Sequence, residues 1–224
     1  DWLRTRNIRM GAPSTIQLLD PIQGLEFNEE KHRYRYNGKW IVSSPTGILS
    51  HDMPEYVKKK IEDTRHIWEN RGNTVHKCLE QYLLGAAELD PGDYADWWEP
   101  LKQCWLWKDA TVMGVELRLV DPKASIAGST DFLIRTAKGA VVLGDLKTCS
   151  SESATKKRKG ADEQLGAYLK MLNSNYSNVM VDKCVTVVSG PSLCRVIAAE
   201  PDDCSRKWDE ALERYRVAQD LMGF

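Results

Sequence analysis

Polar and apolar residues alternate in several short stretches of the chain, which is the pattern of half-buried β-strands. The segment "HRYRYNGKWIVS", residues 32–43, alternates around Asn37-Gly38, the strongest short signal for a β-hairpin. Further aliphatic segments predict the strands of a larger sheet, at 111–120, 124–135, 140–148, 178–189 and 193–200.

Apolar residues spaced by three or four positions, together with capping residues, predict the helices. Ser44 followed by Pro45 is typical of an N-cap and a first helical turn. A long helix is predicted from Pro54 to about Gly85. Further helices are predicted at 93–109, 161–173 and 202–222, with a polar loop between residues 149 and 160.

These elements follow one another without a repeat, a linker or a second apolar core. Their order predicts one α/β (α+β) domain over residues 1–224, in which helices flank a central mixed β-sheet. Within this domain we expect an N-terminal surface arm at 1–30, a hairpin and helical region at 32–110, the core sheet at 111–200 and a C-terminal helix at 202–222.

The net charge is −1, from 31 basic and 32 acidic residues in a chain of 224. No overall field favours a nucleic acid, so any basic surface has to be local. Six cysteines form no C-x-x-C pair, and we expect reduced thiols in a cytoplasmic protein. No apolar run approaches the roughly 20 residues that span a bilayer, and the first residues lack the apolar core of a secretory signal, so no membrane contact is expected.

Three successive predicted strands each contain one carboxylate: Glu116, Asp131 and Asp145. Strands that follow one another in sequence are usually neighbours in a sheet, and Lys147 shares a strand face with Asp145 because side chains alternate. Buried charges need a partner or a metal ion. Two interpretations are open: a solvated strand edge with an Asp145–Lys147 salt bridge, or a divalent metal site, where Mg²⁺ takes carboxylates, water and phosphate oxygens.

The segment "GSTDFLI" and the later "GDLKT", whose aspartates Asp131 and Asp145 are fourteen positions apart, resemble the core of the PD-(D/E)xK nucleases. "GNTVHKCLEQYL" is similar to the G-x-x-x-H motif of the RecB-like exonuclease branch, and "DEQLGAYLKML" to its Q-x-x-x-Y motif. "YRYNGKWIVSSPTGIL" is similar to the hairpin and S-x-T segment of phage-type and mitochondrial-type stand-alone members. The resemblance covers about residues 32–173 and implies a restriction-endonuclease-like core, although Thr130 stands where the family name has proline.

This resemblance implies a metal site. Asp131 and Asp145 would bind Mg²⁺, for which Mn²⁺ would substitute, with the backbone carbonyl of Leu146 as a further ligand. Glu116 would support the site directly or through water, and His76 would be another ligand or a phosphate contact. No iron–sulfur cluster is expected, because four cysteines at compact spacing are lacking.

The same resemblance implies roles for side chains around the metal. Asp131, Asp145 and Glu116 would serve catalysis together with Lys147, the catalytic lysine. Gln164 would orient Lys147 or the scissile phosphate. Tyr168 would contact DNA or brace its helix.

A basic run and a group of tryptophans have two interpretations each. The run Lys156, Lys157, Arg158 and Lys159 is either a solvated loop or a contact to the DNA backbone. The tryptophans at 97, 98, 105 and 107 could stack on bases, but core packing is favoured because they fall on several faces of one helix.

We therefore expect a metal-dependent deoxyribonuclease, an exonuclease on single-stranded DNA or duplex ends, in replication, recombination or degradation in a bacterial or phage-infected cytoplasm. A structure-selective endonuclease on the same core is one alternative, and a catalytically idle module that binds DNA ends is another. A glycosidase with paired carboxylates would leave Lys147 and Gln164 without a role. Polarity, strand preference, the number of metal ions and oligomerisation stay open.

Overall fold

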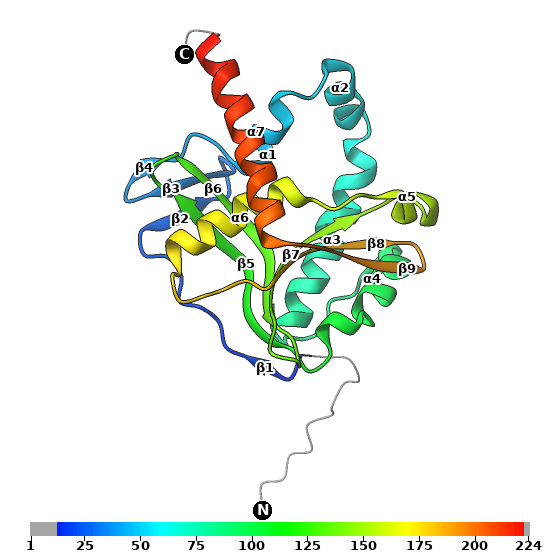
Figure 1. The fold of residues 1–224 in the computed structure, drawn as a ribbon. Helices are drawn as coiled ribbons and strands as arrows, with labels where there is room; N and C mark the ends of the chain where they lie inside the picture. The colour runs from blue at the N-terminus through cyan, green and yellow to red at the C-terminus, as the bar shows by residue number, and fades with distance from the viewer. Residues whose placement is uncertain (1–12, 222–224) are drawn as a thin grey trace, which may run out of the picture.

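A mixed six-stranded sheet forms the centre of the computed structural model, which describes residues 13–221 (Figure 1). β5, β6 and β7 are antiparallel neighbours, β7 and β8 are parallel, and β9 completes the sheet antiparallel to β8. In spatial order the strands are β1 Thr15–Ile16, β5 Thr111–Asp121, β6 Ile126–Arg135, β7 Val141–Thr148, β8 Lys183–Gly190 and β9 Leu193–Ala199.

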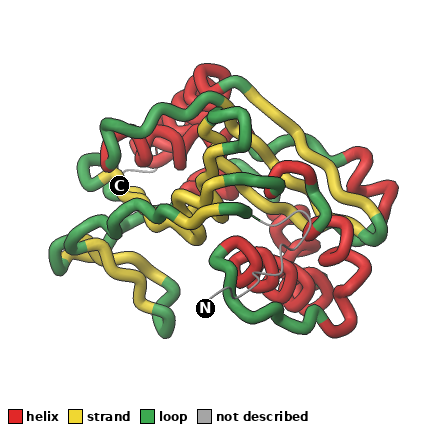
Figure 2. Tube along the Cα trace, turned by 90° about the horizontal axis from the view of Figure 1, so that it is seen from below, coloured by secondary structure: helices red, strands yellow, loops and turns green. Residues whose placement is uncertain are grey.

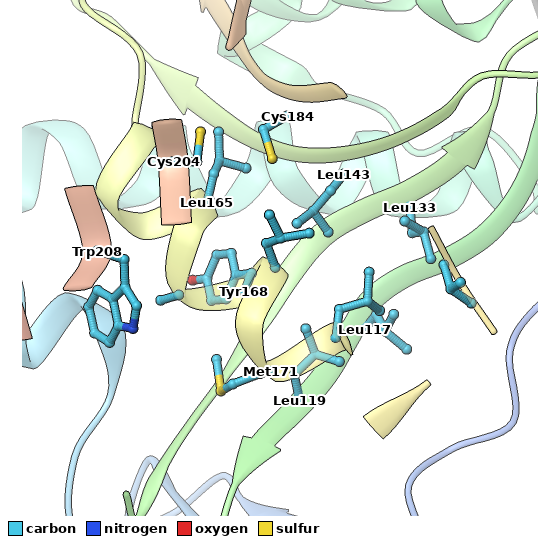
Figure 3. Packing of buried hydrophobic residues seen from close by; sticks show 14 of the residues in the cluster. Leu117, Leu119, Leu133, Leu143, Leu165, Tyr168, Met171, Cys184, Cys204 and Trp208 are labelled. Carbon is cyan, nitrogen blue, oxygen red and sulfur yellow. The ribbon is translucent and has the colours of Figure 1, made fainter. Parts of the chain in front are cut away.

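Helices cover both faces of this sheet, as the sequence predicts (Figure 1). One apolar cluster lies between the sheet and α1, α6 and α7 (Figure 3), and a second lies between the sheet and α3 and α4. Phe132 and Leu133 serve different clusters, because successive strand residues point to opposite faces. These helices are α1 Pro45–His51, α3 Arg65–Leu83, α4 Ala95–Lys102, α6 Asp162–Asn175 and α7 Pro201–Leu221.

The predicted hairpin around Asn37-Gly38 is confirmed. β3 Arg33–Tyr36 and β4 Lys39–Trp40 pair antiparallel, and the two turn residues have φ values of 46° and 79°, as a type I′ turn requires. β2 Leu25–Asn28 pairs with the other side of β3. This small sheet lies at one side of the molecule (Figure 2).

The region expected to be an N-terminal arm contains two strands. β1 pairs in parallel with β5 at the edge of the central sheet, and β2 belongs to the small sheet. From residue 13 on, this region is therefore more than a surface arm, and residues 1–12 lie outside the described part. Strands of two and four residues are too short to show a period.

The long helix predicted from Pro54 is broken at Thr64 into α2 Glu55–Asp63 and α3. The Thr64 hydroxyl donates to the Lys60 carbonyl over 2.8 Å, a local bond that competes with the helical pattern. The α1 prediction is confirmed, because the Ser44 hydroxyl accepts a hydrogen bond from the Gly47 amide.

Three other segments differ from their predictions. The strand predicted from residue 178 begins at Lys183 as β8. The tryptophan-rich segment is not one helix: η1 Gly92–Tyr94, α4 and η2 Trp105–Trp107 follow one another, and Cys104 leaves the helical conformation at the break. The polar loop contains a short helix, α5 Glu152–Lys157, which the Ser151 hydroxyl caps by accepting from the Ala154 amide. Among the helices from residue 13 to 221, none is both long and apolar enough to cross a membrane.

Candidate functional site

The three strand carboxylates lie on adjacent strands of the central sheet. Glu116 is on β5, Asp131 on β6 and Asp145 on β7. Val115 pairs with Phe132, and Leu117 pairs with Thr130, so Glu116 and Asp131 stand opposite each other between these pairs. Glu116 has a φ of 45°, a left-handed conformation that is strained for a residue with a side chain.

Helix α3 brings His76 to the same place. His76 Nδ1 lies 3.1 Å from Asp131 Oδ1, and one ligand atom each of His76, Glu116 and Asp131 lie within 4.8 Å of one another. The amide of Leu146 donates to Asp131 Oδ2, and the hydroxyl of Ser129 donates to Glu116 Oε2 over 3.0 Å. These two bonds orient the carboxylates, and the other Asp131 oxygen, Oδ1, contacts His76.

Mutual charge effects shift the pKa values of this group. Burial raises the pKa of Glu116, and the negative charge of Asp131 raises it further. Burial acts in the same sense on Asp131, but attraction to His76, their hydrogen bond and the Leu146 amide outweigh it and lower the pKa of Asp131. Burial alone would lower the pKa of His76, yet Asp131 and the other carboxylates raise it. The cluster therefore favours a cation at its centre.

Asp145 and Lys147 form the pair that the strand alternation predicts. Lys147 Nζ lies 2.8 Å from Asp145 Oδ2, but Asp145 is only 3% exposed, so the strand edge is not solvated at this residue. Burial raises the pKa of Asp145, and the charge of Lys147 opposes this rise. The contact misses good hydrogen-bonding geometry, and among residues 13–221 Asp145 Oδ2 has no hydrogen-bond partner.

A hydrogen-bonded chain holds Lys147 from helix α6. Lys147 Nζ donates to Gln164 Oε1 over 2.9 Å, and Gln164 Nε2 donates to the Tyr168 hydroxyl over 2.7 Å. Tyr168 is 4% exposed and packs in the apolar cluster (Figure 3). Its hydroxyl holds the Gln164 side chain, and Tyr168 also lines a cleft that reaches the small sheet.

These residues fit a divalent metal ion by their donor set. Carboxylate oxygens suit Mg²⁺ and Mn²⁺, and the buried Asp145 Oδ2, which contacts Lys147 but accepts no well-formed hydrogen bond, is a further candidate ligand atom. Asp145 does not join the mutually close group of His76, Glu116 and Asp131. The Leu146 carbonyl points to the same side of β7 as its amide, and thus toward Asp131, because both groups of a strand residue face one neighbour.

Three clefts meet at this site. One of about 510 Å³ is lined by α3 residues including His76, by Glu116 and by Lys147. A second of about 630 Å³ shares Glu116 and extends to the small sheet, and a third of about 430 Å³ shares Lys147 and extends to Arg158. The site thus lies at the centre of a branched, open surface rather than in a closed pocket.

The basic run divides between two environments. Lys156 and Lys157 belong to α5, and Lys156 pairs with Glu152, whereas Arg158 and Lys159 line the third cleft together with Lys147 and Gln164. The tryptophans also divide: Trp98 and Trp107 are buried, as core packing requires, while Trp105 is 68% exposed.

Sequence reasoning did not identify two features of the site. The left-handed backbone of Glu116 could not be predicted, because glutamate is not a residue type that favours a positive φ. Arg71, directly before the glycine of "GNTVH", lines the first cleft from α3, and its place beside that motif was the available signal.

Comparison with known proteins adds the following. No protein-family model matches the chain, and no curated protein matches it. Among solved structures, 17 chains match, including the crystal structure of SSO0001 with a TM-score of 0.41 and 16% sequence identity. That match covers 76% of this chain and 75% of SSO0001.

Proposed function

We propose that this protein is a metal-dependent deoxyribonuclease that hydrolyses phosphodiester bonds in DNA as an exonuclease. The observation that supports this most is the meeting of His76, Glu116 and Asp131 with the Asp145–Lys147–Gln164 chain where the clefts join. These residues come from β5, β6, β7, α3 and α6, and they are the positions on which the resemblance to RecB-like nucleases rests.

The metal site would consist of His76, Asp131, Asp145 and the Leu146 carbonyl, with Glu116 in support. A bound Mg²⁺ or Mn²⁺ supplies positive charge at the phosphate and lowers the pKa of water. The chain itself keeps the carboxylates apart and oriented, through the Ser129 and Leu146 donors.

Lys147 is the electrostatic catalyst of the proposal. Asp145 and Gln164 hold its ammonium group at the wall of the first cleft, where charge develops on a phosphate during hydrolysis. A donor that is already in place needs no reorganisation when this charge appears. A glycosidase would not need this lysine, which is why phosphodiester hydrolysis is the better match.

The test is cleavage of end-labelled linear and closed circular single-stranded DNA, with Mg²⁺ and with chelator. We expect stepwise shortening of the linear DNA only, and none with chelator. Lys147→Ala should slow the reaction by about 100- to 1,000-fold. Lys170→Ala is the control, because Lys170 is an exposed lysine that pairs with Asp209 on the surface of α6 and α7.

The outcomes separate the alternatives. Cut circles would replace the exonuclease proposal by an endonuclease on the same core. Binding of DNA without cleavage in Mg²⁺ or Mn²⁺ would identify an idle binding module. Cleavage that persists in chelator, or in Lys147→Ala at the wild-type rate, would contradict the proposed chemistry.

A further inference from the structure

Arg71 on α3 is a buried cation without an acidic partner. It is 6% exposed, and no other lysine or arginine among residues 13–221 is as buried. Its Nε donates to the Thr148 hydroxyl over 3.3 Å, and its guanidinium carbon lies 5.6 Å from the centre of the Trp97 ring. In the described part of the chain, Arg71 forms no ion pair and its terminal nitrogens form no hydrogen bond.

This arrangement is unusual for a stabilising residue. Burying a charge costs free energy that a paired carboxylate normally offsets. Burial lowers the pKa of Arg71, and no carboxylate of the described residues acts against this. The guanidinium nevertheless stays charged, because its ordinary pKa is so high.

The charge faces the first cleft beside the proposed catalytic residues. Arg71 lines this cleft together with His76, Lys147 and Thr148. It lies five positions before His76, which is about 7.5 Å along the helix axis. Thr148, which holds Nε, follows Lys147 directly on β7. The Trp97 ring and the Thr148 bond restrain the guanidinium on the protein side, which leaves its terminal nitrogens for the cleft.

We infer that Arg71 is a phosphate-binding residue, which takes the non-bridging oxygens of a DNA backbone phosphate next to the scissile one. This inference rests on the proposed nuclease function and adds to it a contact outside the metal site. The planar fork of arginine matches two phosphate oxygens, which an ammonium group cannot do. A fork fixed in advance also loses little side-chain entropy when the strand binds.

The test measures affinity for a single-stranded oligonucleotide by fluorescence anisotropy, with Ca²⁺ in place of Mg²⁺. Arg71→Met should weaken binding by about 10- to 100-fold, and the slope of log affinity against log salt should fall by about 0.7, the value for one phosphate on a single strand. Arg135→Met is the control, because Arg135 is an exposed arginine at the last residue of β6, and it lines none of the three clefts that meet at the site.

A second measurement ties the effect to one phosphate. Neutral methylphosphonates are placed at each position in turn, and the scissile position is mapped by cleavage in Mg²⁺. For the wild type, we expect one position beside the scissile bond to weaken binding when neutral. In Arg71→Met this same position should no longer matter. Identical profiles in both proteins would overturn the inference.

Stability separates this role from a structural one. Because Arg71 has no acidic partner, Arg71→Met should keep or raise the unfolding temperature while binding falls. A lower unfolding temperature with unchanged DNA affinity would show a structural role instead.

If Arg71→Met fails to fold, Arg71→Lys is the second test variant. It keeps the charge but not the planar fork, and it should weaken binding through the same phosphate. If the wild type neither binds nor cleaves DNA, both the nuclease proposal and this inference fail. If the wild type cleaves DNA and the Arg71 variants bind it with wild-type affinity, only this inference fails.

Discussion

At the scale of single residues, Asp145 is a carboxylate that the fold holds at a cost. It is nearly fully buried, its pKa is raised by burial, and one oxygen lacks a hydrogen bond among the described residues. Lys147 offsets part of this cost without giving good hydrogen-bonding geometry. A buried carboxylate oxygen that lacks a hydrogen-bond donor in the protein is suited to contact a bound ligand such as a cation.

Asp145→Asn should therefore be compared with and without metal. In chelator we expect the free energy of unfolding to change by no more than about 1 kcal/mol, because removal of a buried negative charge is offset by the loss of the Lys147 ion pair. With Mn²⁺ at 100 times its dissociation constant, the wild type should gain about 2.7 kcal/mol, and the variant should lose most of this gain. Thermal unfolding measures both, with the exposed Asp220→Asn as control. A variant that keeps the full gain would exclude Asp145 as a ligand.

Gln164 acts through Lys147 and is a positioning residue. Gln164→Ala removes the acceptor 2.9 Å from Lys147 Nζ and leaves the lysine free to turn. We expect kcat to fall by about 100-fold with KM nearly unchanged, since a small misplacement costs this much. Tyr168→Phe keeps the ring in the core but removes the hydroxyl that holds Gln164. We expect this variant to lower kcat by a smaller factor than Gln164→Ala does, again without a change in KM. An increase in KM without a change in kcat would indicate substrate binding by Gln164 instead.

The motif spacing was enough to predict that Glu116, Asp131 and Asp145 lie on adjacent strands, because adjacency of successive strands and period-two alternation are general. Asp145, however, lies outside the close group that His76, Glu116 and Asp131 form, and strand order alone does not give that distance. The unpartnered state of Arg71 could not be predicted. It depends on which side chains surround Arg71 in the fold, where no described carboxylate pairs with it, and the order of residues does not give these neighbours.

At the scale of elements, the close approach of α6 and α7 positions Gln164. A Cβ atom added to Gly166 of α6 would lie 2.0 Å from the Cys204 carbonyl oxygen of α7. The Cys204 carbonyl cannot change rotamer as a side chain can, so a side chain at position 166 would force α6 and α7 apart. Trp208, one turn further along α7, packs in the same apolar cluster (Figure 3).

Gly166→Ala should lower the free energy of unfolding by about 3 kcal/mol, despite the better helix propensity of alanine. Chemical denaturation measures this change. Ser174→Ala is the matched control, because Ser174 is an exposed residue of the same helix, and we expect a change within about 0.5 kcal/mol. A neutral Gly166→Ala would mean that α7 shifts without loss, and the α6–α7 contact would then not be tight.

Elements with a long period or clear caps were predictable, and short ones were not. The strands β5, β6 and β7, the hairpin and the helices α6 and α7 follow their predicted ranges closely. β1 gains its order from pairing with β5, and α5 from the Ser151 cap and from Arg195, which donates to the Thr155 and Lys156 carbonyls. Such tertiary bonds leave no period in the sequence.

At the scale of the whole molecule, a net charge of −1 coexists with a basic cleft beside the site. The fold class followed from the order of elements, but the clefts depend on how the small sheet, α3 and residues 158–164 lie beside the central sheet. Arg158 and Lys159 line the third cleft with Lys147, whereas Lys207 in the same cleft already pairs with Asp162. A strand that reaches Lys147 through this cleft would pass these residues.

The salt dependence of DNA binding should therefore come from a few residues rather than from the overall field. The double variant Arg158→Ala with Lys159→Ala should lower the slope of log affinity against log salt by about 1.4 on single-stranded DNA. This value corresponds to the loss of two phosphate contacts. Lys156→Ala with Lys157→Ala removes the same charge from α5, where Lys156 already pairs with Glu152, and should change the slope much less. Anisotropy titrations at several salt concentrations measure both slopes. Equal effects of the two double variants would mean that the whole basic run acts as a diffuse charge, and the third cleft would then carry no defined part of the strand.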